Sequence, residues 1–293
     1  KIIREQRPAK GEAAEPPKLY HAHHVREQEH GEPAQHGHGR EQHGPPGGQQ
    51  RLFKRLLIGA GAGEGFAVMK QEREPLERAA RLLFEAEKEH HTLYTLGSGH
   101  SHMIGQDIYA RAGGYAKVYP INEIEMTLAT HPTKSTTLER TASYADVLDA
   151  IYTIEAGDVL LVTSNSGRNP LVIEYTMRAR EKGARIIVIT SLSHSKTIAS
   201  RHESGLRLFE LADVILDNHA PYGDATTPID EATSMGPVST LTGCFLAQCV
   251  MGRFVELLKE HGMEAPVFAS SNMDGADERN RELFDKYVIK TVK

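Results

Sequence analysis

Cysteine is scarce in this chain. The 293 residues include only Cys244 and Cys249, which lie five positions apart in one apolar, helix-like run. Two thiols in such a run are typical of buried side chains rather than of a disulfide framework. The first residues also lack the pattern of a secretory signal. The sequence therefore predicts a protein of the reducing cytoplasm.

Long apolar runs and an excess of positive charge are missing as well. No uninterrupted apolar stretch reaches the roughly 18 residues that a membrane helix needs. The formal net charge of −5 gives no general attraction to nucleic acid or to an anionic membrane surface. We therefore expect neither as a partner. Hydrophobic residues make up 39% of the chain, which is enough to build the core of one large domain.

The N-terminal part differs in composition from the rest. The stretch "HAHHVREQEHGEPAQHGHGREQHGPPGGQQ" is rich in histidine, proline, glycine and glutamine. Such a segment buries too little apolar area to offset the entropy lost on ordering. We predict a disordered tail and junction over residues 1–66 and one folded domain over 67–293. The histidines also leave open a protein that binds zinc through this tail.

From residue 74 onward, helical and strand patterns alternate. Strands are expected at 92–96, 116–121, 158–163, 185–190 and 212–217. Helices are expected at 75–90, 103–113, 141–152, 170–182, 236–262 and 276–288. Alternation of this kind gives parallel βαβ units. The predicted fold is an α/β three-layer αβα sandwich around a five-stranded parallel sheet in the flavodoxin-like order 2-1-3-4-5.

In such a sheet, ligands bind where the strand order reverses, beyond the carboxyl ends of the first and third strands. The loops expected there read "GSGHSH" and "SNSG", and a helix follows each. Helix N-termini attract anions, serine and asparagine donate hydrogen bonds, and glycine lets a ligand approach the backbone. Helix capping is the alternative interpretation of either loop alone. The motifs of a P-loop and of a dinucleotide-binding loop are missing.

Together with the loop "ITSLSHSK" after the fourth strand, these loops predict a phosphate cradle without an arginine cluster. Its predicted residues are Gly97, Ser98, Gly99, His100, Ser101, Ser164, Asn165, Ser166, Gly167 and Ser191. His100 and His102 could together bind zinc, but two ligands alone hold a metal poorly. We therefore favour a role for His100 in contacting the substrate.

Four motifs in order, "GSGHSH", "TSNSGRNP", "ITSLSHS" and "GPVSTLTG", resemble the sugar isomerase (SIS) domain family of phosphosugar-binding proteins. The resemblance covers roughly residues 70–288 and points to a bacterial, phosphoheptose-isomerase-like branch. It implies a five-stranded parallel sheet, a homodimer or tetramer, and sites near subunit interfaces. It also implies that Ser164, Ser166 and Ser191 hold the sugar phosphate.

Aldose–ketose isomerisation needs a base that moves a proton between C1 and C2, and a second group that opens the sugar ring. Glu139 in "STTLER" is the candidate base, although Thr136 and Glu139 also fit a capping box. Glu123 and Glu125 are alternative bases. The ring-opening candidates, each of which also suits an ordinary surface loop, are His194 and His202.

The sequence thus predicts a protein that binds a phosphorylated sugar or amino sugar and isomerises it by aldose–ketose proton transfer. No cofactor and no metal are expected. The alternative is a non-catalytic sugar-phosphate sensor with the same binding domain.

Overall fold

The computed structural model describes residues 63–288, so residues 1–62 of the predicted tail lie outside the described residues. Residues 63–66, which the prediction also placed in the disordered junction, form the start of a helix. Within residues 63–288 five strands form one parallel sheet in the order β2-β1-β3-β4-β5. The strands are β1 (Leu93–Gly97), β2 (Val118–Ile121), β3 (Val159–Thr163), β4 (Arg185–Thr190) and β5 (Val214–Asp217). The predicted fold class and strand order are confirmed.

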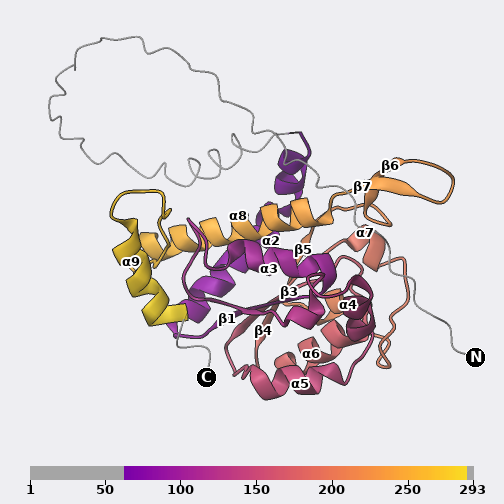
Figure 1. Ribbon diagram of the computed structural model, residues 1–293, viewed down its shortest axis with the longest axis horizontal. Helices are drawn as coiled ribbons and strands as arrows, with labels where there is room; N and C mark the ends of the chain where they lie inside the picture. The colour runs from indigo at the N-terminus through magenta and orange to yellow at the C-terminus, as the bar shows by residue number, and fades with distance from the viewer. Residues whose placement is uncertain (1–62, 289–293) are drawn as a thin grey trace, which may run out of the picture. The chain divides into compact units, whose positions relative to one another are not determined.

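Helices cover both faces of the sheet (Figure 1). One face carries α2 (Gly63–Lys88), α3 (His102–Ile108) and α8 (Ser239–Glu260), and the other carries α5 (Tyr144–Ile151) and α6 (Pro170–Glu181). Successive side chains of β3 alternate between the two cores: Val159 and Leu161 pack toward α2 and α8, whereas Leu160 and Val162 pack toward α5 and α6. A strand buried on both faces therefore reads as a continuous apolar run.

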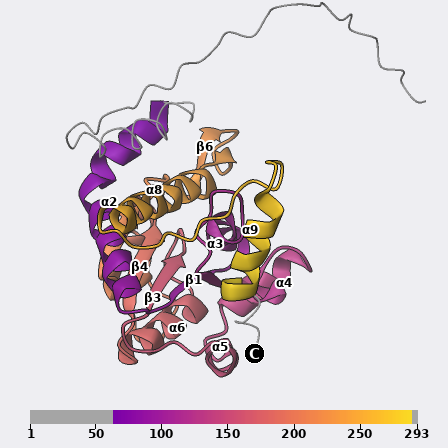
Figure 2. The ribbon, with the colours of Figure 1, turned by 90° about the vertical axis from the view of Figure 1, so that its left-hand side faces the viewer.

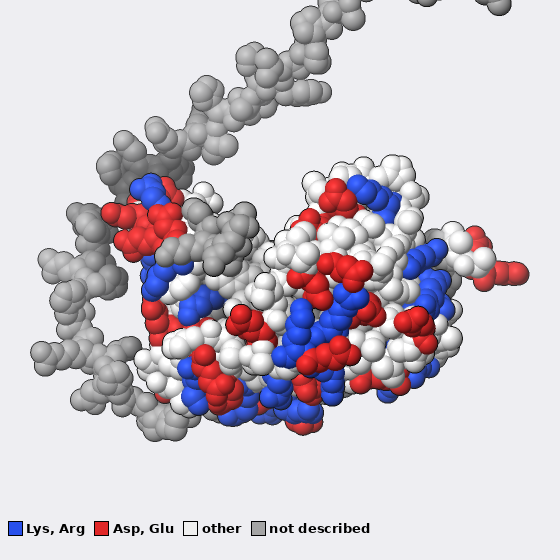
Figure 3. Space-filling view, turned by 90° about the horizontal axis from the view of Figure 1, so that it is seen from below, with Lys and Arg blue, Asp and Glu red and all other residues white. Residues whose placement is uncertain are grey.

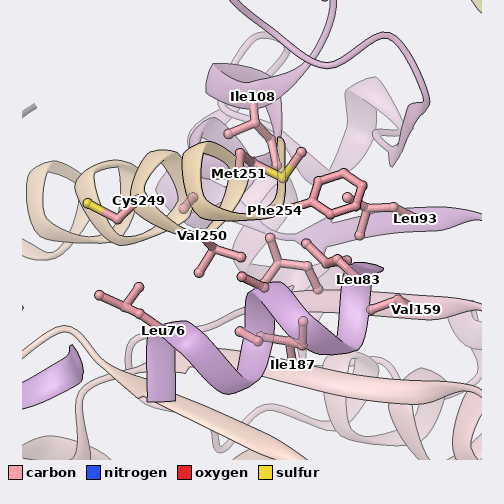
Figure 4. Close-up of a cluster of buried hydrophobic side chains, with 14 of the residues drawn as sticks. Leu76, Leu83, Leu93, Ile108, Val159, Ile187, Cys249, Val250, Met251 and Phe254 are labelled. Atoms are coloured by element: carbon pink, nitrogen blue, oxygen red, sulfur yellow. The ribbon is translucent and has the colours of Figure 1, made fainter. Parts of the chain in front are cut away.

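The larger core lies between the sheet and the pair α2 and α8. Leu76 and Leu83 of α2 and Val250 and Phe254 of α8 meet above Ile187 of β4 (Figure 4). Full burial of each such side chain contributes about 2 kcal/mol to the free energy of unfolding. Among the described helices α8 alone has the length and composition of a membrane span, with a mean hydropathy of 1.4, but 56% of that window is buried inside the fold. This burial is what the core helix of a globular domain shows. Cys244 and Cys249, both on α8, form no disulfide within the described part.

Helix α2 begins at Gly63 rather than at residue 75, and α3 ends at Ile108 rather than at residue 113. Three further elements were not predicted. The polar stretch before α5 contains a helix, α4 (Pro132–Glu139), and a single helical turn, α7 (Leu192–Ser195), follows β4. Between β5 and α8 lies a β-hairpin of β6 (Ala225–Pro228) and β7 (Ser234–Pro237), which projects from the fold (Figure 1). These segments bury almost no apolar face, so hydrophobic periodicity gave no signal for them.

The C-terminal segment lies beside the β2 edge of the sheet. It comprises α9 (Ala276–Leu283) and the π-helical turn η4 (Phe284–Val288) (Figure 2). Tyr119 Oη donates a hydrogen bond to the Tyr287 carbonyl (2.9 Å). The segment therefore covers an edge that would otherwise be open to pairing with another strand.

The outer face of α5 and α6 is a mixed, ion-paired surface. Basic and acidic side chains alternate over it (Figure 3). Arg178 bonds to Asp146 (2.6 Å) and to Glu174 (2.7 Å), and Lys182 bonds to Asp149 (2.9 Å). Exposed pairs of this kind contribute little stability. They show that Arg178 and Lys182 have carboxylate partners.

Candidate functional site

The loops that follow β3, β4 and β5 are joined by hydrogen bonds at the carboxyl end of the sheet. Ser191 N donates to the Asn165 carbonyl (3.2 Å), and Asn218 Nδ2 donates to Asn165 Oδ1 (3.0 Å). Asn165 is therefore the point at which the three loops meet. The predicted convergence of the serine-rich loops is what parallel strand ends impose.

The loop after β1 is built on close backbone approach. A Cβ at Gly97 would lie 2.5 Å from the Ser101 carbonyl oxygen, so only glycine fits there. This contact lets the 3₁₀ turn η1 (Gly99–Ser101) and then α3 begin directly at the end of the strand. Ser98 is buried, and its Oγ donates to Glu139 Oε2 (2.8 Å). The turn thus aims Ser98 across the strand ends toward α4.

The loop after β3 keeps several donors available. Ser164 Oγ accepts a hydrogen bond from Gly167 N (3.2 Å), which closes the turn. Among the described residues no group bonds to the hydroxyl of Ser166, which is partly exposed. Asn169 is the N-cap of α6, but its side chain makes no bond to its own helix. Pro170 has no N–H, so the N–H groups of Leu171 and Val172 are the ones at the start of this 12-residue helix that the side chain leaves uncapped.

Glu139 is the last residue of α4, so the capping-box interpretation of Thr136 and Glu139 is wrong. Both carboxylate oxygens are held from outside the helix: Oε2 accepts from Ser98, and Oε1 accepts from Asn169 Nδ2 (2.7 Å). Burial raises the pKa of Glu139, against the opposing effects of the Ser98 hydrogen bond and of the nearby Arg140 and Arg201. A partly buried carboxylate with a raised pKa is a suitable proton acceptor near neutral pH.

The prediction of a cradle without an arginine cluster is wrong. Arg140, Arg168 and Arg201 gather around this site, and none of them forms an ion pair with a carboxylate of the described residues. Burial, together with Arg168 and Arg140, lowers the pKa of Arg201. The Nε of Arg168 is buried and has no hydrogen-bond partner in the described structure. These guanidinium groups repel one another and have Glu139 nearby as a negative charge without a direct ion pair, an arrangement that can attract an anion.

His194 lies next to this cluster. Its ring packs on Tyr222 with centroids 4.8 Å apart, and its Nδ1 accepts a hydrogen bond from Gly223 N (3.2 Å). Burial, reinforced by Arg168, lowers the pKa of His194. An accepting Nδ1 places the proton of the neutral ring on Nε2. His194 therefore offers a neutral N–H donor at neutral pH.

Two other predicted residues have their polar atoms engaged. His202 Nε2 donates to Glu174 Oε2 (2.9 Å), while its Nδ1 lies 2.8 Å from Ser204 Oγ. His202 is thus buried against α6 and is not brought to the strand ends. Ser191 is fully buried, and its Oγ donates to the Ala220 carbonyl (2.6 Å) and caps α7. Ser191 braces the loop, and its contact with phosphate stays a prediction.

The remaining residues of the first loop lie around η1. His100 is exposed and Ser101 is partly buried. His102 Nδ1 donates to the Gly99 carbonyl. Within residues 63–288 no group of three or more histidine, cysteine, aspartate or glutamate side chains is arranged to hold a metal ion. The proposed zinc binding by the N-terminal histidines lies outside the described residues.

The alternative bases have other contacts. Glu123 Oε1 accepts a hydrogen bond from Tyr152 Oη (2.7 Å). Glu125 lies 3.5 Å from Lys134 Nζ. Within the described residues neither carboxylate forms a hydrogen bond or ion pair with the serine-rich loops, whereas Glu139 bonds directly to Ser98. Of the three carboxylates, Glu139 is the one that the structure joins to the strand ends.

Comparisons with known proteins identify similar chains. A family model described as the SIS domain matches residues 66–191. A UPF0309 protein of Halalkalibacterium halodurans is 42% identical over 239 residues, which span 81% of this chain and 96% of that protein. A UPF0309 protein of Oceanobacillus iheyensis is 36% identical over 222 residues, which span 75% of this chain and 90% of that protein. Among solved structures, a phosphoheptose isomerase of Neisseria gonorrhoeae is 18% identical, with a TM-score of 0.42, covering 71% of this chain and 98% of that one.

Proposed function

This chain belongs to the SIS domain family and, within it, to the UPF0309 proteins of bacteria, and from that premise we propose that it binds a phosphorylated sugar and isomerises it by aldose–ketose proton transfer. The observation that carries the proposal is the group of arginines without carboxylate partners beside the serine-rich loop. A phosphate ester is a dianion near neutral pH, and it accepts hydrogen bonds on all its free oxygens.

In the proposed complex the phosphate lies at the N-terminus of α6. Ser164 and Ser166 donate from the loop, the uncapped first turn of α6 donates backbone N–H groups, and Arg168 supplies opposite charge. Asn165 ties this loop to its neighbours, so the donors keep their spacing. Preorganised donors cost little entropy on binding, which suits a compact anion.

The proposed chemistry uses Glu139 as the base. Glu139 takes the proton from C2 of the open-chain aldose and returns it to C1, while the hydroxyl proton passes from O2 to O1, so no cofactor is consumed. Ser98 holds the carboxylate in place during both transfers. The neutral Nε2–H of His194 is the proposed donor to the ring oxygen during ring opening.

We also propose that the chain forms a homodimer or tetramer in the cytoplasm. Large apolar side chains are exposed at the end of the fold that carries the hairpin: Ile229 is 63% exposed and Met235 is 70% exposed. Tyr222 and Leu241 are also exposed. A two-stranded hairpin with such side chains is only marginally stable in water without a packing partner.

Proton exchange tests the reaction. Incubation with a panel of sugar phosphates in D₂O, read by proton NMR, should show deuterium uptake at C2 with the wild-type protein. Glu139→Gln should lower the exchange rate by about 10²–10⁴-fold, because it removes the proton acceptor, and should leave binding within a few-fold. Binding without exchange identifies a sugar-phosphate sensor instead. Neither binding nor exchange with any sugar phosphate contradicts the proposed function.

A further inference from the structure

Asn169 occupies the N-cap of α6 but does not cap it. An asparagine at this position usually accepts a hydrogen bond from an N–H group of its own first turn, which stabilises the helix. Here Nδ2 donates to Glu139 Oε1 (2.7 Å), and Oδ1 accepts from Arg201 Nη1 (2.9 Å). The residue is only 7% exposed. Its side chain therefore forms hydrogen bonds with two charged groups and none with the backbone N–H groups of α6.

The two neighbours of Asn169 fix the orientation of its amide. A carboxylate only accepts hydrogen bonds, and a guanidinium only donates them. The NH₂ group must therefore face Glu139, and the oxygen must face Arg201. The amide thus serves as a neutral spacer between a negative and a positive group.

We propose that Asn169 is a positioning residue, which holds the Glu139 carboxylate against Ser98 and keeps it out of direct contact with the Arg201 guanidinium. This inference rests on the proposed function, in which Glu139 is the base. A direct arginine–carboxylate pair would stabilise the ionised carboxylate through charge-assisted hydrogen bonds and would make it a poorer proton acceptor. The spacer also leaves the rest of the Arg201 guanidinium available to an anion.

The helix that carries Glu139, α4, packs against η1, η2 (Ile124–Met126) and α6. The residues on or beside η1, η2 and α4 include His100, Glu123, Glu125, Lys134 and Arg140, and Arg168 and Arg201 lie near the start of α6. Helix α6 itself carries Glu174, Arg178, Arg180 and Glu181. Glu125 faces Lys134, and Glu123 bonds to a tyrosine hydroxyl. The positive groups that act on Glu139 are Arg140 and Arg201. Of these two, only Arg201 is held through Asn169.

The test follows the titration of Glu139 by ¹³C NMR of the glutamate carboxyl groups, without any sugar present. The Glu139 signal is identified by its loss in Glu139→Gln. Asn169→Ala should lower the pKa of Glu139, because charge-assisted contact with Arg201 outweighs the loss of the Asn169 Nδ2 hydrogen bond, which by itself would raise that pKa. Asn169→Asp should raise that pKa, because it places a second negative charge beside Glu139. Asn169→Ser, which can still cap α6, should lower the pKa as Asn169→Ala does.

The double variant Asn169→Ala/Arg201→Gln provides the matched control. It should lose the downward shift, since the shift depends on Arg201. Arg140→Gln should raise the pKa equally in both backgrounds, because Arg140 acts on Glu139 without Asn169. The inference is overturned if Asn169→Ala and Asn169→Ser leave the Glu139 titration unchanged, or if the downward shift persists without Arg201.

The titration needs no substrate, so its outcome is independent of whether the protein isomerises a sugar. If exchange is observed, Asn169→Ala should also move the acid limb of the pH–rate profile down by the same amount as the Glu139 titration. The Kd for the sugar phosphate should change by less than about threefold, because Glu139 and not the phosphate is displaced. A role confined to folding would alter neither the titration nor the acid limb.

Discussion

Gly99 and Gly167 both adopt a φ of +56°, a conformation that costs residues with a Cβ about 1 kcal/mol. Their surroundings differ. A Cβ at Gly167 would lie 3.0 Å from Ser195 Oγ and 3.3 Å from Leu208 Cβ. At Gly99 no atom of the described residues lies within 4 Å of such a Cβ. An alanine at Gly99 would therefore add backbone strain alone, whereas an alanine at Gly167 would add both backbone strain and a steric clash.

We predict that Gly167→Ala lowers the free energy of unfolding by about 1–2 kcal/mol more than Gly99→Ala does, because only the first adds a clash. Urea unfolding of the two variants measures the difference. Equal losses would show that the loop after β3 relaxes freely, which the close packing of Gly167 against Leu208 does not allow.

Part of the site could be predicted, residue by residue, from the sequence. The order of the motifs placed Ser98, Ser164 and Ser191 at strand ends, because parallel strands bring their carboxyl ends to one edge. The clustering of the arginines was missed because Arg168 and Arg201 are 33 positions apart along the chain and are brought together by tertiary contacts, among them the main-chain hydrogen bond from Arg201 N to the Arg168 carbonyl (2.9 Å). An arginine directly after the loop, in "SGRNP", was the one signal available.

At the scale of elements, the N-terminal end of α6 and the loop before it should act together. Replacing Ser164 and Ser166 by alanine should weaken the binding of a sugar phosphate by about 1–3 kcal/mol, because charge-assisted hydrogen bonds are lost. Calorimetric titration measures this. Ser234→Ala on the exposed strand β7 is the matched control and should leave the affinity unchanged. An unchanged affinity in the double variant would show that this loop does not bind the phosphate.

The strands of the sheet and the helices packed on it were predictable, whereas α4, α7 and the β6–β7 hairpin were not. The continuous apolar runs of β3 and β4 have no other stable solution than burial on both faces. In contrast, α4 and the β6–β7 hairpin form from polar, threonine-rich and proline-containing segments, whose structure depends on tertiary neighbours and on turn geometry. Asp224, at a φ of +69°, shows this dependence: its carboxylate accepts from Ser239 N (2.7 Å) and thereby joins the hairpin to the start of α8.

At the scale of the whole molecule, self-association should depend on the hairpin. We predict that the wild-type chain sediments as a dimer or tetramer. Ile229→Ser together with Met235→Ser should weaken association at least about tenfold, because each substitution removes apolar surface from the proposed contact. Ile151→Ser, on the exposed side of α5, is the control and should not change the sedimentation. A wild-type chain that sediments as a monomer at all concentrations would contradict this prediction.

Binding of a phosphate ester depends most on the positive charge of the arginines beside the serine-rich loop, which form no ion pair with a carboxylate of the described residues. Calorimetric titration of the wild-type protein and of Arg168→Gln with sugar phosphates and with the same sugars lacking phosphate tests this dependence directly. We predict measurable binding of phosphorylated sugars only, and affinity about tenfold lower or worse in Arg168→Gln, since a charged hydrogen bond contributes about 1.5–3 kcal/mol. Equal binding of phosphorylated and free sugars, or unchanged affinity in the variant, would contradict it.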